Sequence, residues 1–236
     1  MNWDLLLYPL FIIAILFSAW AQFKVSSTFR KYSSVSTHAG KNAMDVARMI
    51  LLSEGVHDVS IGRVGGNLTD HFDPRNKVLA LSDSTFASSS AAAIGVAAHE
   101  AGHAVQHAKG YFPIRLRSFL VPVASFSSKM SWVFIMLGIV ITAFAAETSF
   151  GYYVLLFGIG LFAVTTVFQL VNLPCEFNAS GRAMSALRSS GLYTDEELSA
   201  ARAVLFAAAM TYVAATFTSA VQLFRLLLIF GRRNDR

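Results

Sequence analysis

The hydrophobic positions of this chain gather into four long runs separated by more polar segments. Three of them, residues 5–23, 130–146 and 152–173, contain no Asp, Glu, Lys or Arg. The fourth, residues 203–224, is also uncharged and is rich in Ala, Thr and Ser, which suit close helix packing in lipid. A helix needs about 17–25 mostly apolar residues to cross a bilayer. The pattern therefore predicts three membrane-spanning helices and a fourth helix that either spans or is re-entrant.

The runs divide the chain into five segments. We predict an N-terminal transmembrane anchor (1–23), a cytoplasmic segment (24–129), a transmembrane helical hairpin (130–173), a second cytoplasmic segment (174–202) and a C-terminal transmembrane or re-entrant helix with a basic tail (203–236). A cleaved signal peptide is the alternative for the first run. Its leading residues would have to be basic, whereas Asp4 makes them acidic, so we favour a retained anchor.

The positions of basic residues predict the orientation of the chain in the membrane. They flank the first and second runs on the side of segment 24–129, at Lys24, Arg30, Lys31, Arg115, Arg117 and Lys129. The short connection 147–151 has neither Lys nor Arg. Because cytoplasmic loops of membrane proteins carry an excess of positive charge, segments 24–129 and 174–202 are predicted to be cytoplasmic. The tail conflicts with this orientation if the fourth run spans, because its arginines would then lie outside.

Composition narrows the class further. Of 236 residues, 55% are hydrophobic and 14% are charged, against about 25% charged in soluble domains, which excludes both a disordered chain and a compact soluble protein. A single cysteine, Cys175, excludes an internal disulfide and a thiolate-rich metal site. The net charge of +5 fits basic cytoplasmic loops. It forms no stripe interleaved with aromatics, so no nucleic-acid partner is expected.

The first cytoplasmic segment has the pattern of an α+β unit. Apolar residues between 43 and 51 recur at helical spacing, with Gly55 as the helix stop. A strand over 56–64 and a hairpin over 67–81, turning at 73–76, follow. Ser90 and its serine neighbours then provide the N-cap of an Ala-rich helix that ends near Gly110.

The second cytoplasmic segment is predicted to be helical. Pro174 suits the first turn of a helix that continues to Arg188 and stops at Gly191. Thr194 and Glu197 have the spacing of a capping box, which would open the last long helix. The fold class is thus mainly α, a multi-pass helical membrane protein with a small cytoplasmic α+β unit.

Residues 99–103 (HEAGH) form the candidate metal-binding and catalytic motif. Positions i and i+4 of a helix share one face, so His99 and His103 can bind one metal ion. Glu100 would flank the ion as a general base, as in the HExxH signature of zinc hydrolases. The pattern therefore predicts a zinc ion (Zn²⁺) on the Ala-rich helix.

Catalytic zinc usually has three protein ligands and one water. His107 cannot be the third, because two helical turns separate it from His99 by about 12 Å. Among the carboxylates, Glu147 lies across the membrane, Glu54 looks like an exposed helix end and Glu197 is used in the capping box. Glu176 remains, and His₂Glu is a known set of catalytic zinc ligands.

The chain resembles the family of membrane-bound neutral zinc metallopeptidases, often called YugP-like. The resemblance covers nearly the whole chain and rests on residues 68–74 (LTDHFDP), 81–82 (LS), 99–106 (HEAGHAVQ) and 173–180 (LPCEFNAS). It implies a gluzincin-like, zincin-type protease with Glu176 as third ligand. The family often has Asp in place of Asn178, and broader gluzincins place Asp where this chain has Ser180.

These departures leave two roles open. Asn178, Ser180 or Asp70 would orient the ligand histidines, and His71 or Arg182 would stabilise the oxyanion. The expected function is peptide hydrolysis at the cytoplasmic face of the cell membrane. The substrates would be polypeptides, in particular membrane proteins in contact with the lipid bilayer. The sequence names no oligomeric state or complex partner. The alternative is a membrane scaffold or adaptor with a structural or inactive zinc site.

Overall fold

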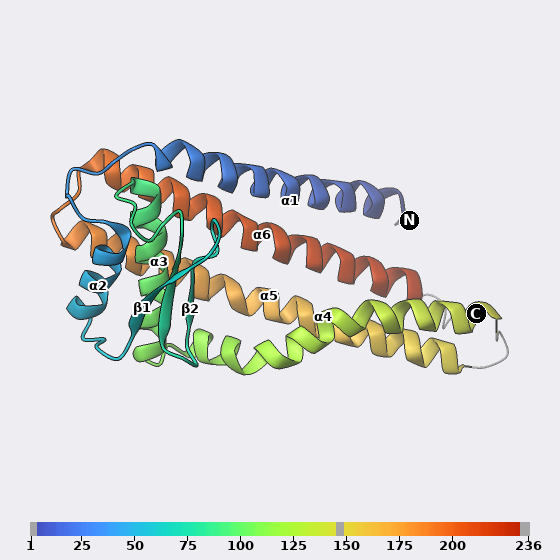
Figure 1. The fold of residues 1–236 in the computed structure, drawn as a ribbon. Coiled ribbons are helices and arrows are strands. Elements are labelled where there is room, and N and C mark those ends of the chain that lie inside the picture. Colours follow the sequence, from blue (N-terminus) through green and yellow to red (C-terminus); the bar gives the residue numbers. More distant parts are fainter. Residues whose placement is uncertain (1–3, 145–148, 232–236) are drawn as a thin grey trace. The chain divides into compact units, whose positions relative to one another are not determined.

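The computed structural model describes residues 4–144 and 149–231. The connection around Glu147, residues 1–3 and the basic tail, on which some of the predictions above fall, lie outside these described residues. The elements, in chain order, are α1 (Asp4–Ser33), α2 (Ala43–Ser53), β1 (Ser60–Val64), β2 (His71–Asp73), β3 (Val78–Ser82), α3 (Ala91–Ala108), α4 (Phe112–Phe144), α5 (Phe150–Ser189) and α6 (Asp195–Gly231) (Figure 1).

Four of the helices, α1, α4, α5 and α6, are long and apolar enough to cross a membrane. The presence of four such helices confirms the predicted multi-pass helical fold. The fourth apolar run lies within one continuous helix, α6. The chain is a mainly helical membrane protein with one small sheet in the part that the structure describes.

The chain divides into two compact units. The first comprises Met1–Ala19, Leu116–Asn172 and Tyr212–Arg236, and the second comprises Trp20–Arg115 and Leu173–Thr211. The first holds most of the apolar runs, and the second holds the sheet, α2, α3 and all predicted site residues.

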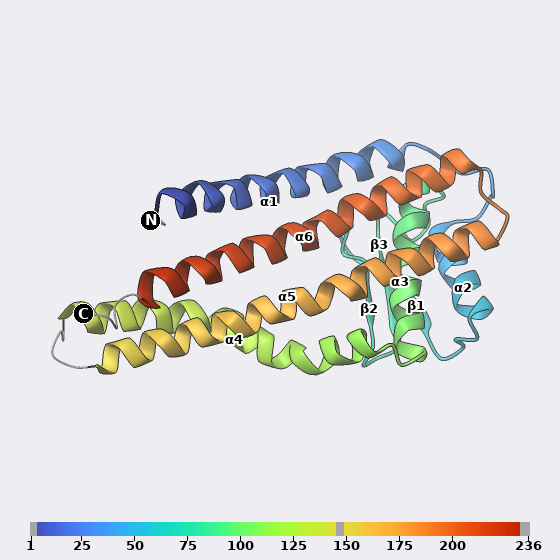
Figure 2. The ribbon, with the colours of Figure 1, turned by 180° about the vertical axis from the view of Figure 1, so that it is seen from behind.

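In the second unit, α3 is surrounded by other elements. Its buried face packs against α2, β3 and the parts of α5 and α6 that belong to this unit, with Val46, Leu79, Ile94, Leu187 and Leu205 in one core. Figure 2 shows the C-terminal part of α5 beside α3. The Ala-rich sequence of α3 allows these neighbours to approach closely, which brings α5 within reach of the histidines.

The ends of the helices follow the predicted capping residues. The Ser90 side chain accepts a hydrogen bond from the Ala93 amide at the start of α3. Gly55 and Gly110 take positive φ, +74° and +63°, just beyond α2 and α3, where glycine avoids the steric cost of the left-handed region. These boundaries confirm the sequence prediction.

The sheet has the strand order β1-β3-β2. Strands β2 and β3 form the predicted antiparallel hairpin, and β1 pairs with β3 in parallel. The hairpin turn is fixed by the Asp73 carboxylate, which accepts hydrogen bonds from the amides of Arg75 and Asn76. The first strand is shorter than predicted, and β2 stands at an edge of the sheet.

In the first unit, α4 and α5 form the predicted hairpin. A Cβ placed on Gly138 would lie 2.4 Å from the Leu155 amide nitrogen, and one on Gly158 would lie 2.6 Å from that of Ile135. The two backbones therefore touch at these glycines, where no side chain keeps the helices apart. Helix α1 packs along α6, where Ser18 and Thr218 share a hydrogen bond of 2.9 Å.

One local prediction is wrong. The helix was expected to begin anew at Pro174, but α5 continues through this residue from Phe150 to Ser189. A proline inside a helix removes one backbone hydrogen bond. Cys175 and Glu176, which follow this proline, are buried within the second unit. Their tertiary packing outweighs the loss of that one hydrogen bond. The third candidate ligand therefore lies inside one long helix.

Candidate metal centre

Three side chains converge in the second unit. His99 and His103 on α3 and Glu176 on α5 offer ligand atoms that all lie within 4.8 Å of one another. The Nε2 atoms of His99 and His103 lie 3.3 and 3.5 Å from Oε2 of Glu176. Glu176 is buried, with 2% of its side chain exposed, and the histidines are 14% and 10% exposed. The structure brings together the three residues predicted as ligands.

The close approach of α3 and α5 makes this convergence possible. Gly102, one residue before His103, faces the backbone of Ala179, and a Cβ on Gly102 would lie 2.7 Å from the Ala179 carbonyl oxygen. Ala179 follows Glu176 by one helical turn, so the same contact sets the position of the carboxylate. Glycine is required at position 102 by space, not by backbone conformation.

Each histidine is also held at its second nitrogen. Nδ1 of His99 lies 3.1 Å from the Ser180 hydroxyl, and Nδ1 of His103 lies 3.0 Å from Oε1 of Gln106. Ser180 was among the residues expected to orient a ligand. Gln106 was missed, although its spacing of three from His103 on one helix places both on the same face.

Asn178 and Arg182 lie one step further from the histidines. The Gln106 side-chain amide donates to the Asn178 side-chain carbonyl at 3.0 Å, and Nε of Arg182 donates to the same oxygen at 2.9 Å. Gln106 therefore links Asn178 to His103. Arg182 is engaged at its Nε by this contact.

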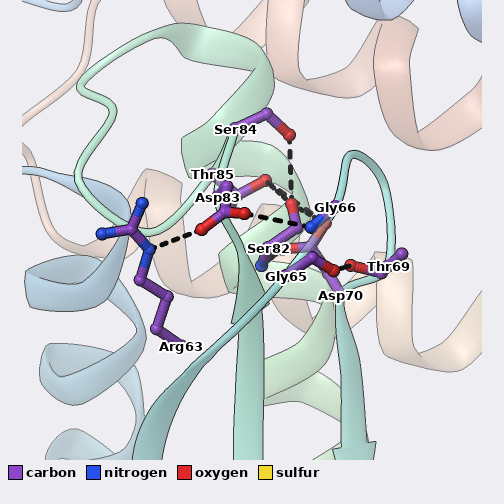
Figure 3. Close-up of polar contacts among 9 residues, drawn as sticks. All are labelled: Arg63, Gly65, Gly66, Thr69, Asp70, Ser82, Asp83, Ser84 and Thr85. Carbon is purple, nitrogen blue, oxygen red and sulfur yellow. Dashed lines mark hydrogen bonds and ion pairs between the residues drawn. The ribbon is translucent and has the colours of Figure 1, made fainter.

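Asp70 belongs to a different network (Figure 3). Its carboxylate accepts hydrogen bonds from the amide and hydroxyl of Ser82, at 2.7 and 2.8 Å, and from the Thr85 hydroxyl at 3.2 Å. Nearby, Asp83 accepts from Arg63 and from the Gly66 amide. These bonds tie the loop before β2 to the end of β3. Asp70 thus supports the hairpin that carries His71.

Glu100 follows His99 on α3 and is partly buried. Burial raises the pKa of its carboxyl above the usual range, an effect that His99 opposes and that the negative charges of Glu176 and Asp70 reinforce. Such a carboxyl takes up a proton more readily than one in water. This property suits a group that accepts a proton in a reaction.

His71 lies exposed on the edge strand β2, and it is among the groups that interact electrostatically with the Glu100 carboxyl and so influence its pKa. Its Nδ1 lies 2.8 Å from the Thr69 carbonyl oxygen. His107, excluded as a ligand from the sequence, stacks edge-to-face on Phe72, with ring centroids 5.8 Å apart. Phe72 of the hairpin therefore contacts α3 one helical turn beyond His103.

The donor atoms fit zinc. Two imidazole nitrogens and one carboxylate oxygen are a ligand set of catalytic zinc sites, which leave a further position for water or substrate. A buried carboxylate is costly unless partners compensate its charge, and the two imidazoles, 3.3 and 3.5 Å from Oε2 of Glu176, are such partners, alone or through an ion that they share. The arrangement suits a zinc ion held by the three side chains.

Comparisons with known proteins agree with this chemistry. The chain matches the family model described as "Putative neutral zinc metallopeptidase" over residues 7–231. It is 40% identical over 226 residues to "Putative membrane protease YugP" of Bacillus subtilis (strain 168), covering 95% of this chain and 96% of that protein. No solved structure matches the chain. The chain belongs to this family of neutral zinc metallopeptidases, whose cofactor is zinc.

Proposed function

We propose that this zinc metallopeptidase is an HExxH endopeptidase of the gluzincin type that cleaves membrane or juxtamembrane proteins at the cytoplasmic surface. In this proposal His99, His103 and Glu176 hold zinc, and Glu100 is the general base. The convergence of the two histidines of α3 with Glu176 of α5 carries the proposal, because it completes a His₂Glu set on the helix that also carries Glu100.

The roles of the residues follow from their positions. Zinc, when bound, supplies a Lewis acid that polarises the scissile carbonyl and activates water. Glu100, next to His99 on the same helix, accepts the proton of the attacking water and passes it to the leaving amine. The exposed edge of β2 would pair with an extended substrate by strand addition. The substrate then lies along α3, between the hairpin and the proposed ligands.

For the oxyanion we propose His71 rather than Arg182. His71 lies on the edge strand near Glu100, whereas the Nε of Arg182 is used by Asn178. The Thr69 carbonyl can only accept, so Nδ1 of His71 carries the hydrogen. Its Nε2 then donates to an oxyanion when the ring is protonated.

The proposed location rests on α5. Glu176 follows Leu173, the last residue of the apolar run, by three positions, which is about 5 Å of helix axis. No break separates the two, because α5 is continuous. A ligand so close to the end of a span favours substrates that are themselves at the bilayer surface.

Replacing Glu100 with Gln tests the function. The variant should keep zinc and its fold but lose cleavage by about 10²–10⁴-fold, the usual contribution of a general base. Glu54→Gln, at the end of α2 and paired with Lys109, is the matched control and should stay active. Retained cleavage in Glu100→Gln would exclude the proposed base.

The same variant identifies substrates. Membranes from cells carrying wild-type or Glu100→Gln protein are compared by quantitative proteomics. We expect full-length membrane proteins to accumulate with Glu100→Gln. Accumulation of soluble proteins alone would contradict the membrane-substrate part of the proposal and leave the peptidase assignment intact.

A further inference from the structure

We infer that Gln106 is a positioning residue that fixes His103 in the tautomer whose Nε2 faces the metal. The inference rests on the ligand set proposed above. Gln106 is completely buried, and its side-chain amide contacts three groups: Nδ1 of His103, the Cys175 carbonyl and the Asn178 side chain. A buried amide with every contact assigned is a good reporter of hydrogen-bond direction.

The groups at the two ends of this network can each form a hydrogen bond in only one direction. The Cys175 backbone carbonyl can only accept, and it lies 2.8 Å from the Gln106 side-chain nitrogen. Nε of Arg182 can only donate, so the Asn178 atom that it contacts at 2.9 Å is the carbonyl oxygen. That same oxygen lies 3.0 Å from the Gln106 nitrogen. Both hydrogens of the Gln106 amide therefore have acceptors.

The direction of the last bond follows. With its nitrogen committed, Gln106 turns Oε1 toward His103, and an amide oxygen can only accept. Nδ1 of His103, 3.0 Å away, must carry the hydrogen. In the neutral ring the lone pair then resides on Nε2, the atom 3.5 Å from Glu176. This is the form in which an imidazole ligates zinc through Nε2.

The other ligand is held differently. Nδ1 of His99 contacts the Ser180 hydroxyl at 3.1 Å, and a hydroxyl both donates and accepts. Ser180 therefore places the ring of His99 without dictating its tautomer. Of the two histidines, His103 is the one whose protonation pattern is built into the fold.

The network also gives Asn178 a defined part. Its Oδ1 accepts hydrogen bonds from both Gln106 and Arg182. An aspartate would accept the same two bonds. Asn178→Asp is thus the conservative variant, and it should preserve the orientation of Gln106.

Zinc affinity of the purified full-length protein in detergent tests the inference, measured by competition with a chromophoric chelator. Gln106→Met keeps the volume of the side chain but lacks its carbonyl and amino groups. We expect zinc binding to weaken about 10–100-fold, as is typical when the partner of a ligand histidine is lost. Asn178→Asp should bind as wild type does. Gln222→Met is the control, because Gln222 is also buried but belongs to the other unit.

A second measurement needs no change at Gln106. Nitrogen-15 spectra of histidine-labelled, zinc-free wild type, at a pH where the rings are neutral, report the tautomer of His103. Its signal is assigned by its absence in His103→Gln. We expect hydrogen on Nδ1. Hydrogen on Nε2, or a mixture, would overturn the inference, even if Gln106→Met did not fold.

The outcomes separate this inference from the proposed function. If wild type does not bind zinc, or His103→Gln binds it equally well, the ligand set itself is wrong. If wild type binds and His103→Gln does not, while folded Gln106→Met binds like wild type, only the role of Gln106 is refuted.

Discussion

Glu176 is the residue that connects the two halves of the proposed site. It is the only carboxylate in the converging group and comes from a helix 77 positions later in sequence than His99. Its loss would leave two imidazoles, and with them a pair instead of the three ligands usual for catalytic zinc. Its replacement should therefore cost more affinity than any change in the surrounding hydrogen bonds.

We predict that Glu176→Ala weakens zinc binding strongly. The loss should exceed the factor of about 10–100 that is expected when a hydrogen-bond partner of a ligand histidine is removed. Elemental analysis of the purified protein should show substoichiometric zinc. Glu54→Ala provides the comparison and should retain full occupancy. Full occupancy in Glu176→Ala would remove this residue from the site.

His71 gives a kinetic prediction. If its protonated ring donates to the oxyanion, His71→Ala should lower kcat about 10²–10³-fold, as for other oxyanion donors, with little change in KM. His57→Ala, which alters an exposed histidine before β1, should have normal kinetics. An unchanged kcat in His71→Ala would leave Arg182 as the remaining candidate.

At this scale the sequence was informative only where residue type and spacing coincide. His99 and His103 were predicted from their spacing on one helix, and Glu176 was reached by excluding the other carboxylates. Gln106 was not predicted, because a glutamine carries no chemical signature of its own. Its role depends on the Cys175 carbonyl of another helix, which no local pattern reveals.

At the scale of elements, the contact between α3 and α5 determines whether the ligands meet. In a helix interior, Gly→Ala usually stabilises by about 0.5–1 kcal/mol. At Gly102 the sign should reverse, because the added Cβ would meet the Ala179 backbone at 2.7 Å. Backbone atoms cannot rotate away, so the two helices must separate.

We therefore predict that Gly102→Ala destabilises the protein by about 1–3 kcal/mol, the usual cost of overpacking, and weakens zinc binding. Gly181→Ala is the matched control on α5, where a Cβ would meet nothing within 4 Å; it should leave zinc binding unchanged and slightly raise stability. Thermal unfolding and chelator competition measure both. Equal zinc affinity in Gly102→Ala and wild type would contradict the tight contact.

Helix ends were predicted better than helix continuity. The Ser90 cap and the reciprocal bonds of Thr194 with Glu197 follow local rules, so the sequence suffices to place them. Continuity through Pro174 depends on burial of the residues that follow it. Local preference favoured a new helix there, and packing against the rest of the unit overrides it.

For the whole molecule, the orientation of the chain determines the side of the membrane on which the second unit lies. The basic residues of 24–129 favour the cytoplasm. The connection between α4 and α5 should then face the opposite side.

Arg225, within α6, lies over the rings of Tyr8 and Phe11, 5.1 and 5.0 Å from their centroids. These rings give the charge aromatic partners inside an apolar helix.

Cysteine labelling measures this topology. In a chain with Cys175→Ala, Ser149→Cys should react with a membrane-impermeant maleimide on intact cells. His57→Cys should react only after the membrane is opened. The reverse pattern would place the metal centre outside the cell and refute cytoplasmic action.

The origin of Glu176 in α5 has a consequence for biosynthesis. During translation α3, with His99 and His103, leaves the ribosome before the hairpin of α4 and α5 exists. In the proposed site, the two histidines therefore have no third ligand until that hairpin is inserted and α5 docks on α3. The proposed hydrolytic centre is thus completed only together with the membrane-embedded part of the chain.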